Sequence, residues 1–307
     1  MRDAMSAPAS STTGSPMSVG QGFSDIDVPV DRRVRDVRGR VAGWRSAGET
    51  IALVPTVGAL HAGHDLLIQA ARQAASRTVV ALLPTPVRLF SGEEKVADPA
   101  DELADLRRIS KVGADSCWVP APELMIPPGV ETRVRVGGLA ELMEGLHRED
   151  ALDWTTTALT KLIIQVEPDA VVFADRDYQL LLIIARIAAD LDLPVRIVAA
   201  ATAREPDGLA VSAATAQLDP AARAIAAAVP QTLSRISRRL ADGVSSPQAE
   251  IAWGRDQLAM AGISVVEYLD VRDPRTLECV TTSGAPARVF VAVRLGDVRL
   301  VDSVAVG

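Results

Sequence analysis

The sequence is poor in aromatic residues, cysteine and histidine, and each shortage excludes a class of function. Aromatic residues make up 3% of the 307 positions, too few for the stacking platforms that bind single-stranded nucleic acid. The two cysteines, Cys117 and Cys279, fall in no paired metal or redox spacing. With three histidines in the chain, no His and Cys set completes a zinc site. We therefore expect neither a nucleic-acid partner nor a metal held by protein ligands.

Long apolar runs and an excess of positive charge are also lacking. The richest apolar stretch, Leu180 to Ala185, is soon interrupted by Arg186 and Asp190, far short of the roughly 20 residues that a membrane helix requires. A formal net charge of −7 argues against a surface that binds phosphate backbones. Residues 1–25 are rich in Ser, Ala, Thr, Gly and Pro and lack the apolar core of a signal peptide. We expect a cytoplasmic protein with a disordered leader over 1–25 and no membrane partner.

The body of the chain alternates between helical and strand patterns. Apolar residues recur at helical spacing from Val34 onward, and they alternate with apolar runs such as Ile51 to Val54 and Thr78 to Leu83. These runs lack polar residues at every second position, which is typical of strands covered on both faces. The pattern predicts an α/β fold in which a parallel sheet is covered by helices, with a further short strand at Thr132 to Val136.

The pattern changes near Thr202. An Ala-rich helix after Asp219-Pro220 and a helix near Gln248 to Ala261 are followed by three closing strands. The last two strands flank Gly296-Asp297, a typical hairpin turn. We therefore predict a Rossmann-like nucleotide-binding domain over 26–201 and a smaller C-terminal α+β lid domain over 202–307.

Two of the three histidines lie in one short loop, which runs from Pro55 to His64 between a predicted strand and a predicted helix. The N-terminus of a helix offers unpaired N–H groups and a partial positive charge, so it suits phosphate groups. Imidazoles at His61 and His64 can donate hydrogen bonds to oxygens whose charge grows in a transition state. The alternative is that both rings merely cap the helix or pack against the sheet.

The same loop resembles the signature of the pantothenate synthetases, nucleotidyltransferase-superfamily members with a histidine-x-glycine-histidine loop. The resemblance extends from Val34 to the C-terminus. Phe173 to Gln179 is similar to the second ATP motif of the family, and Arg204 to Ser212 is similar to the segment of its third. Further matches are Glu144-Gly145, Arg148 and Val301 to Ser303.

This resemblance implies an ATP-dependent condensation of pantoate with β-alanine through a pantoyl-adenylate. It also implies ATP and Mg²⁺ as cofactors and a homodimer. His61, His64 and Arg176 would be catalytic, with Arg176 standing where the family has a lysine. The implied nucleotide site further contains Val57, Gly58, Gly63, Ala174, Asp175, Asp177, Ala203, Val211 and Ser212.

Several positions depart from the family pattern. Arg88 and Leu180 stand where the family has two pantoate-binding glutamines, and Gln179 is adjacent to the second, so these three are the implied acid-binding positions. Ala213 and Ala214 replace a serine and an arginine of the third motif, which removes a hydroxyl and a bidentate cation. Two interpretations follow: a ligase with weak or altered acid specificity, or a pseudoenzyme that acts as a nucleotide-binding or regulatory partner.

Other polar residues receive plainer interpretations. His147 is interpreted as a solvated loop residue with no catalytic or metal spacing around it. The four carboxylates at Asp98, Asp101, Glu102 and Asp105 are interpreted as the exposed face of a helix.

Overall fold

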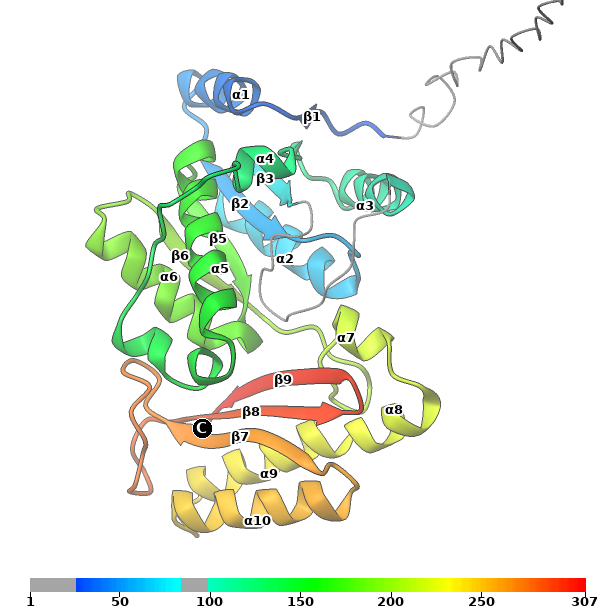
Figure 1. Ribbon diagram of the computed structural model, residues 1–307, viewed down its shortest axis with the longest axis vertical. Coiled ribbons are helices and arrows are strands. Elements are labelled where there is room, and N and C mark those ends of the chain that lie inside the picture. Colours follow the sequence, from blue (N-terminus) through cyan, green and yellow to red (C-terminus); the bar gives the residue numbers. More distant parts are fainter. Residues whose placement is uncertain (1–25, 84–98) are drawn as a thin grey trace, which may run out of the picture.

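The computed structural model describes residues 26–83 and 99–307, which form a six-stranded and a three-stranded sheet (Figure 1). The expected leader over 1–25 and the acid-site candidate Arg88 lie outside the described residues. All strand pairs of the larger sheet are parallel, in the order β1-β4-β3-β2-β5-β6. Its strands are β1 (Val30–Asp31), β2 (Ile51–Thr56), β3 (Arg77–Leu82), β4 (Ser116–Trp118), β5 (Ala170–Ala174) and β6 (Arg196–Ala200).

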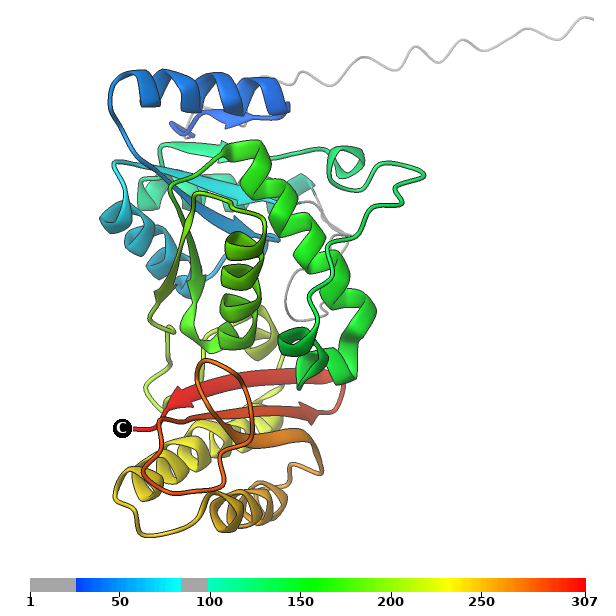
Figure 2. The same cartoon turned by 90° about the vertical axis from the view of Figure 1, so that its left-hand side faces the viewer.

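Helices cover both faces of this sheet, as the uniformly apolar strands predict. Ile51 and Leu53 of β2 point into one core, whereas Ala52 and Val54 point into the other, because successive strand residues face opposite sides. In Figure 2 the green helices and the cyan helix α2 lie on opposite sides of the sheet. The first core contains α1 (Val34–Ser46), α5 (Glu144–Val166) and α6 (Tyr178–Asp190), and the second contains α2 (Ala62–Ala74) and α3 (Pro99–Val112).

The smaller sheet is antiparallel and also has two apolar faces. Val289 and Val291 of β8 pack among α9 and α10, whereas Phe290 and Ala292 face the larger unit together with Met143. The predicted hairpin is confirmed, since Leu295 pairs with Val298 across a turn at Gly296-Asp297. The elements are α7 (Ala213–Ala216), α8 (Pro220–Ala226), α9 (Ala228–Ala241), α10 (Pro247–Met260), β7 (Val265–Arg272), β8 (Arg288–Leu295) and β9 (Val298–Ala305).

The predicted strand at Thr132 to Val136 is wrong. Within the part of the chain that the structure describes, this segment pairs with no strand. Side chains of α5 take its hydrogen bonds instead, because the Val134 N–H donates to Thr157 Oγ1 and Thr156 Oγ1 donates to the Val134 carbonyl. The segment runs between the short helix α4 (Pro122–Met125) and the 3-10 turn η1 (Gly138–Glu141).

No helix among the described residues is both long enough and apolar enough to cross a lipid bilayer.

Candidate active site at the switch point of the parallel sheet

The strand order reverses between β2 and β5. From β2 the chain continues through β3 to β4 on one side, whereas β5 and β6 lie on the other. Ligands of open α/β sheets bind outside the carboxyl ends of the strands at such a point. β2 leads into the loop with two histidines, and β5 leads into η2 (Asp175–Asp177), so the two motifs predicted from the sequence meet at this edge.

The histidine loop begins α2 with a reciprocal capping arrangement. The Gly63 N–H donates to Nδ1 of His61 at 3.1 Å, and the His61 N–H donates to Nδ1 of His64 at 3.1 Å. Because each Nδ1 accepts, each neutral ring carries its proton on Nε2. The cap uses the Nδ1 edges of both rings, whose centroids are 4.1 Å apart. The loop therefore offers two adjacent Nε2–H donors at a helix N-terminus.

The environment keeps both rings neutral at pH 7. Burial, together with the charges of Arg176 and Arg108, lowers the pKa of His61 to about 4. Burial also holds the pKa of His64 well below its ordinary value, with contributions from His61, Arg176 and Arg108. Two neutral donors near the guanidinium groups of Arg176 and Arg108 make a local positive field in a protein of net charge −7. An anionic ligand suits this field.

Asp105 fixes the loop that precedes the histidines, and its interpretation as an exposed helix residue is wrong. Its side chain is buried, with Oδ2 accepting from the Ala59 N–H at 3.0 Å and Oδ1 from the Leu60 N–H at 2.8 Å. Ala59 has a φ of 51°, and Gly58 before it has a φ of 91° with Asp105 3.2 Å from where a Cβ would be. Glycine is therefore required at Gly58, because a side chain would be strained and crowded there.

Arg108 lies one turn further along α3 and supports the same loop. Its guanidinium contacts both carboxylate oxygens of Asp65 at 2.7 Å. Asp65 belongs to the first turn of α2, where a carboxylate is favoured by the helix dipole. Neither Asp105 nor Arg108 was among the site residues predicted from the sequence. The sequence signal for Asp105 is a polar residue at a position of the apolar stripe of α3, because Asp105 and Ile109 lie on the same face of the helix.

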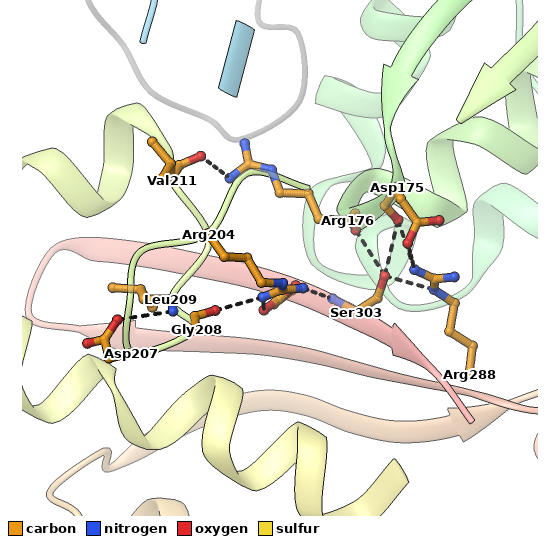
Figure 3. Close-up of polar contacts among 10 residues, drawn as sticks. Asp175, Arg176, Arg204, Asp207, Gly208, Leu209, Val211, Arg288 and Ser303 are labelled. Carbon is orange, nitrogen blue, oxygen red and sulfur yellow. Dashed lines mark hydrogen bonds and ion pairs between the residues drawn. The ribbon is translucent and has the colours of Figure 1, made fainter. Parts of the chain in front are cut away.

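At the end of β5, the turn η2 is tied to the C-terminal sheet (Figure 3). Arg288 of β8 contacts the Asp175 carboxylate, and its Nε donates to Ser303 Oγ at 2.9 Å. Ser303 Oγ in turn lies 3.3 Å from the carbonyl oxygens of both Asp175 and Arg176. The Arg288 guanidinium also lies over the ring of Tyr178 at 4.1 Å. The backbone at Ala174 to Arg176 is therefore held by residues more than one hundred positions away.

Arg176 extends from this turn toward the segment that follows β6. Its Nη1 lies 3.4 Å from the Val211 carbonyl (Figure 3). Its Nε lies 3.6 Å from the Asp177 carboxylate. Gly63 approaches the same carbonyl, which would lie 3.5 Å from a Cβ at that position. Burial raises the pKa of Asp177, partly offset by Arg176. Three of the predicted segments thus converge around Arg176.

The third segment is ordered by its own hydrogen bonds. The Val211 N–H donates to the Ala203 carbonyl at 2.9 Å, and Arg204 binds both oxygens of Asp302 at 2.7 and 2.9 Å. Ser212 is buried and caps α7, with Oγ accepting from the Thr215 N–H at 3.0 Å. The predicted positions Ala203, Val211 and Ser212 therefore lie on one rigid connection beside Arg176.

The described acid-site candidates lie in the first turn of α6. Leu180 lines a cavity between the larger unit and the C-terminal sheet. Gln179 lines the cavity too, but its side-chain amide is hydrogen-bonded to the backbone. Nε2 donates to the Leu139 and Leu142 carbonyls, each at 2.8 Å, and Oε1 accepts from the Glu144 N–H at 3.1 Å. Both N–H groups of Gln179 are used, so it positions the cavity wall. Val57 packs against the core that contains α5 and α6.

The donors at this site suit the phosphate groups of a nucleoside triphosphate. The two Nε2–H groups, Arg176 and the start of α2 all favour phosphate oxygens. Among residues 26–83 and 99–307, no group of three or more His, Cys, Asp or Glu side chains could hold a metal ion.

Fold and site together define a Rossmann-like nucleotide-binding protein of the α/β class, with a helix N-terminus at the switch point and an antiparallel sheet closing over it. Residues 30–305 match the family described as pantoate-beta-alanine ligase. The pantothenate synthetase of Acidiphilium cryptum is 40% identical over 276 residues, covering 90% of this chain and 99% of its own. That of Ruegeria pomeroyi is 36% identical over 282 residues, covering 92% and 98%.

A solved structure agrees with these relatives. The pantothenate synthetase from Thermus thermophilus is 31% identical and superposes with a TM-score of 0.82, covering 91% of this chain and 99% of its own. The chain therefore belongs to the pantoate-beta-alanine ligase family.

Proposed function

We propose that this protein is an ATP-dependent ligase that joins a pantoate-type carboxylic acid to an amine such as β-alanine through an acyl-adenylate. The observation that supports this most strongly is the pair of Nε2–H donors of His61 and His64 beside Arg176. His61 and His64 lie at the start of α2 and Arg176 lies in η2 beside them, where charge on a triphosphate would be stabilised. Family membership supports the same reaction type.

The first half-reaction uses the positive field at the switch point. A carboxylate oxygen of the acid attacks the α-phosphorus of ATP, the bond from that phosphorus to the bridging oxygen breaks, and pyrophosphate leaves. His61, His64 and Arg176 stabilise the charge that accumulates on the phosphate oxygens. Mg²⁺ carried by the nucleotide would screen the same phosphates. The fixed loop behind Asp105 keeps both imidazoles oriented without reorganisation.

In the second half-reaction the free amine attacks the acyl carbon of the mixed anhydride. The bond from that carbon to the AMP oxygen breaks, AMP leaves, and the proton lost by the nitrogen passes to solvent. Positioning is the main contribution that the protein can make here, because the anhydride is already activated. The homodimer implied by the family resemblance remains part of the proposal and can be checked by light scattering.

The direct test is exchange of labelled pyrophosphate into ATP in the presence of Mg²⁺ and pantoate or related small acids. A His64→Ala variant should lose activity by a factor on the order of one hundred, since it removes one preorganised donor. His147→Ala is the matched control, because His147 is exposed on α5 and lies outside the histidine loop. Equal exchange rates for His64→Ala and the parent protein would refute the assignment of that ring.

A second function is favoured by Ala213 and Ala214, which follow Ser212 and offer no side-chain donor to a triphosphate. In this alternative the protein binds a nucleotide but does not activate an acid, and it acts as a regulatory partner. Calorimetry separates the two functions. ATP binding without pyrophosphate exchange across a panel of acids supports the pseudoenzyme, whereas exchange with any acid excludes it.

A further inference from the structure

The neighbours Asp302 and Ser303 on β9 point to opposite faces of the C-terminal sheet. Asp302 lies opposite Val291 and Ser303 lies opposite Phe290, and these two residues of β8 face different cores. Residues directly opposite each other in an antiparallel pair share a face, so the two β9 side chains diverge. Asp302 is 3% exposed and Ser303 is 1% exposed. Any effect of these two side chains on a bound molecule must therefore pass through other residues.

Ser303 holds the turn η2, from which Arg176 extends. Its Oγ accepts from Arg288 Nε at 2.9 Å and lies 3.3 Å from the carbonyl oxygens of Asp175 and Arg176 (Figure 3). Because Arg288 occupies one lone pair of the hydroxyl, the single hydrogen of Ser303 is directed to these carbonyls. The backbone that carries the Arg176 side chain is thus fixed by a residue of the C-terminal sheet.

Asp302 holds the segment that Arg176 reaches. Its carboxylate accepts from both terminal nitrogens of Arg204, at 2.7 and 2.9 Å. Arg204 also donates to the Gly208 carbonyl at 2.9 Å, which closes the turn between them (Figure 3). This turn leads directly to Val211, whose carbonyl lies 3.4 Å from Nη1 of Arg176. Asp302 therefore fixes the partner at the far end of the Arg176 side chain.

The two anchors are also fixed relative to each other, because the Ser303 N–H donates to the Asp302 carboxylate at 2.8 Å. Arg176 begins on the segment that Ser303 holds and ends against the segment that Asp302 holds. The contacts of its guanidinium are long, at 3.4 Å to Val211 and 3.6 Å to Asp177, and hydrogen bonds of that length are weak. The position of this guanidinium therefore depends mainly on the two anchored segments.

We infer that Asp302 and Ser303 are positioning residues of the phosphate site, which consists of His61, His64 and Arg176. The pair sets where the Arg176 guanidinium lies relative to the two imidazoles. This inference rests on the proposed acid activation and adds to it two buried residues that touch no substrate. A charged donor stabilises a transition state only where it is preorganised, and a misplacement of about 1 Å can lower a rate by up to about one hundredfold.

A double-mutant cycle with Arg176 tests the role of Ser303. In the presence of Arg176, Ser303→Ala should lower kcat/KM for pyrophosphate exchange by about tenfold. In an Arg176→Met background the same change should lower it by less than about twofold, because no guanidinium remains to be misplaced. A merely structural disturbance would lower the rate by the same factor in both backgrounds, and that result would overturn the inference.

Asp302→Asn gives a second cycle through the other anchored segment. It keeps the size of the side chain but presents an NH₂ group to Arg204, so the turn before Val211 shifts. We expect the same dependence on Arg176. Thermal denaturation shows which variants fold, and the cycle of either Ser303 or Asp302 is sufficient to decide.

Ser237→Ala is the matched control. The Ser237 hydroxyl also donates to a backbone carbonyl of β9, that of Ala305 at 2.8 Å, but it does so from α9. This variant should keep the kcat/KM of its parent in both Arg176 backgrounds. A loss as large as that in Ser303→Ala would show that β9 as a whole is sensitive, and the specific role of Ser303 would be refuted.

ATP affinity separates this inference from the proposed function. In calorimetry with ATP and Mg²⁺ and without an acid, Ser303→Ala should raise the Kd by about threefold or more only when Arg176 is present. If the unmodified protein binds ATP but exchanges pyrophosphate with no acid, the proposed ligase fails and the cycle in Kd still decides the inference. Equal losses of affinity in both backgrounds would overturn the inference and leave the ligase intact. Absence of ATP binding by the unmodified protein would overturn both.

Discussion

Arg299 on β9 and Glu144 at the start of α5 form a bidentate pair across the junction of the two sheets, with contacts of 2.7 and 2.9 Å. Their side chains are 7% and 19% exposed. Arg299 also binds Glu267, so one guanidinium neutralises two carboxylates and connects the C-terminal sheet to the cavity wall. Sequence separation of 155 residues makes this pair a purely tertiary contact.

Replacement of Arg299 by Met should destabilise the protein by about 2–4 kcal/mol, because the largely buried Glu144 would lose its counter-charge and Glu267 would keep only the exposed Arg294. Urea denaturation at neutral pH measures the loss. Arg294→Met is the control: it also contacts Glu267, at 2.6 Å, but its side chain is 45% exposed, and such pairs contribute less than about 1 kcal/mol. Equal losses of unfolding free energy in the two variants would show that burial does not determine how much these ion pairs stabilise the protein.

Asp105→Asn should lower kcat/KM for pyrophosphate exchange by roughly tenfold to one hundredfold. The NH₂ group of the asparagine would face either the Ala59 or the Leu60 N–H, and two donors cannot bond to each other, so the loop before the histidines shifts. Asp101→Asn, an exposed change one turn earlier on α3, should leave the rate unchanged. If Asp105→Asn kept full activity, the loop would not depend on this carboxylate.

Asp105 also illustrates what the sequence could not reveal. The helix, the strand and the histidine loop were predictable, because apolar periodicity and a strand-to-helix junction are local features. The exposed Asp101, four residues earlier, has the same helical spacing as Asp105, and the two N–H groups that Asp105 binds are 45 and 46 residues away, so the sequence could not show what Asp105 binds. The role of Gln179 was hidden for the same reason, since its partners lie in a loop 35 to 40 residues earlier.

Segments without a regular partner were the hardest to predict. Val134 lies in a β-branched run that favours a strand, yet threonines of α5 satisfy its backbone. Conversely, the hairpin at Gly296-Asp297 was predictable because its turn residues and both strands are adjacent in sequence. Local chemistry identified the elements, and the tertiary contacts decided which polar residues support the site.

Acidification should destabilise the protein through the histidine loop. Burial and neighbouring arginines lower the pKa of His61 from 6.5 to about 4, and His64 is lowered in the same direction. Between these two values the unfolded chain binds protons that the folded chain does not, so stability falls as the pH falls through this window. For partly exposed His61 the loss is on the order of 1–2 kcal/mol after solvent screening.

Denaturation curves at several pH values between about 4 and 7 measure this slope. His61→Gln should flatten it, because glutamine does not titrate, whereas the exposed His147→Gln should leave it as in the parent protein. A slope that survives in His61→Gln and in a His61→Gln/His64→Gln double variant would contradict the assignment of proton uptake to these rings.

Gly63→Ala should reduce activity while the fold is retained. A Cβ at Gly63 would lie 2.8 Å from Cε1 and 2.9 Å from Nδ1 of His61, so the ring must move and its bond from the Gly63 N–H must lengthen. Because a misplaced donor stabilises the transition state much less, kcat/KM for pyrophosphate exchange should fall by about tenfold or more.

Gly43→Ala is the matched control within α1, where a Cβ meets nothing within 4 Å. It should keep full activity and raise stability by about 0.5–1 kcal/mol, because alanine favours the helix interior. If Gly63→Ala were as active as Gly43→Ala, the orientation of His61 would not matter to the reaction, and the role proposed for its Nε2–H group would have to be abandoned.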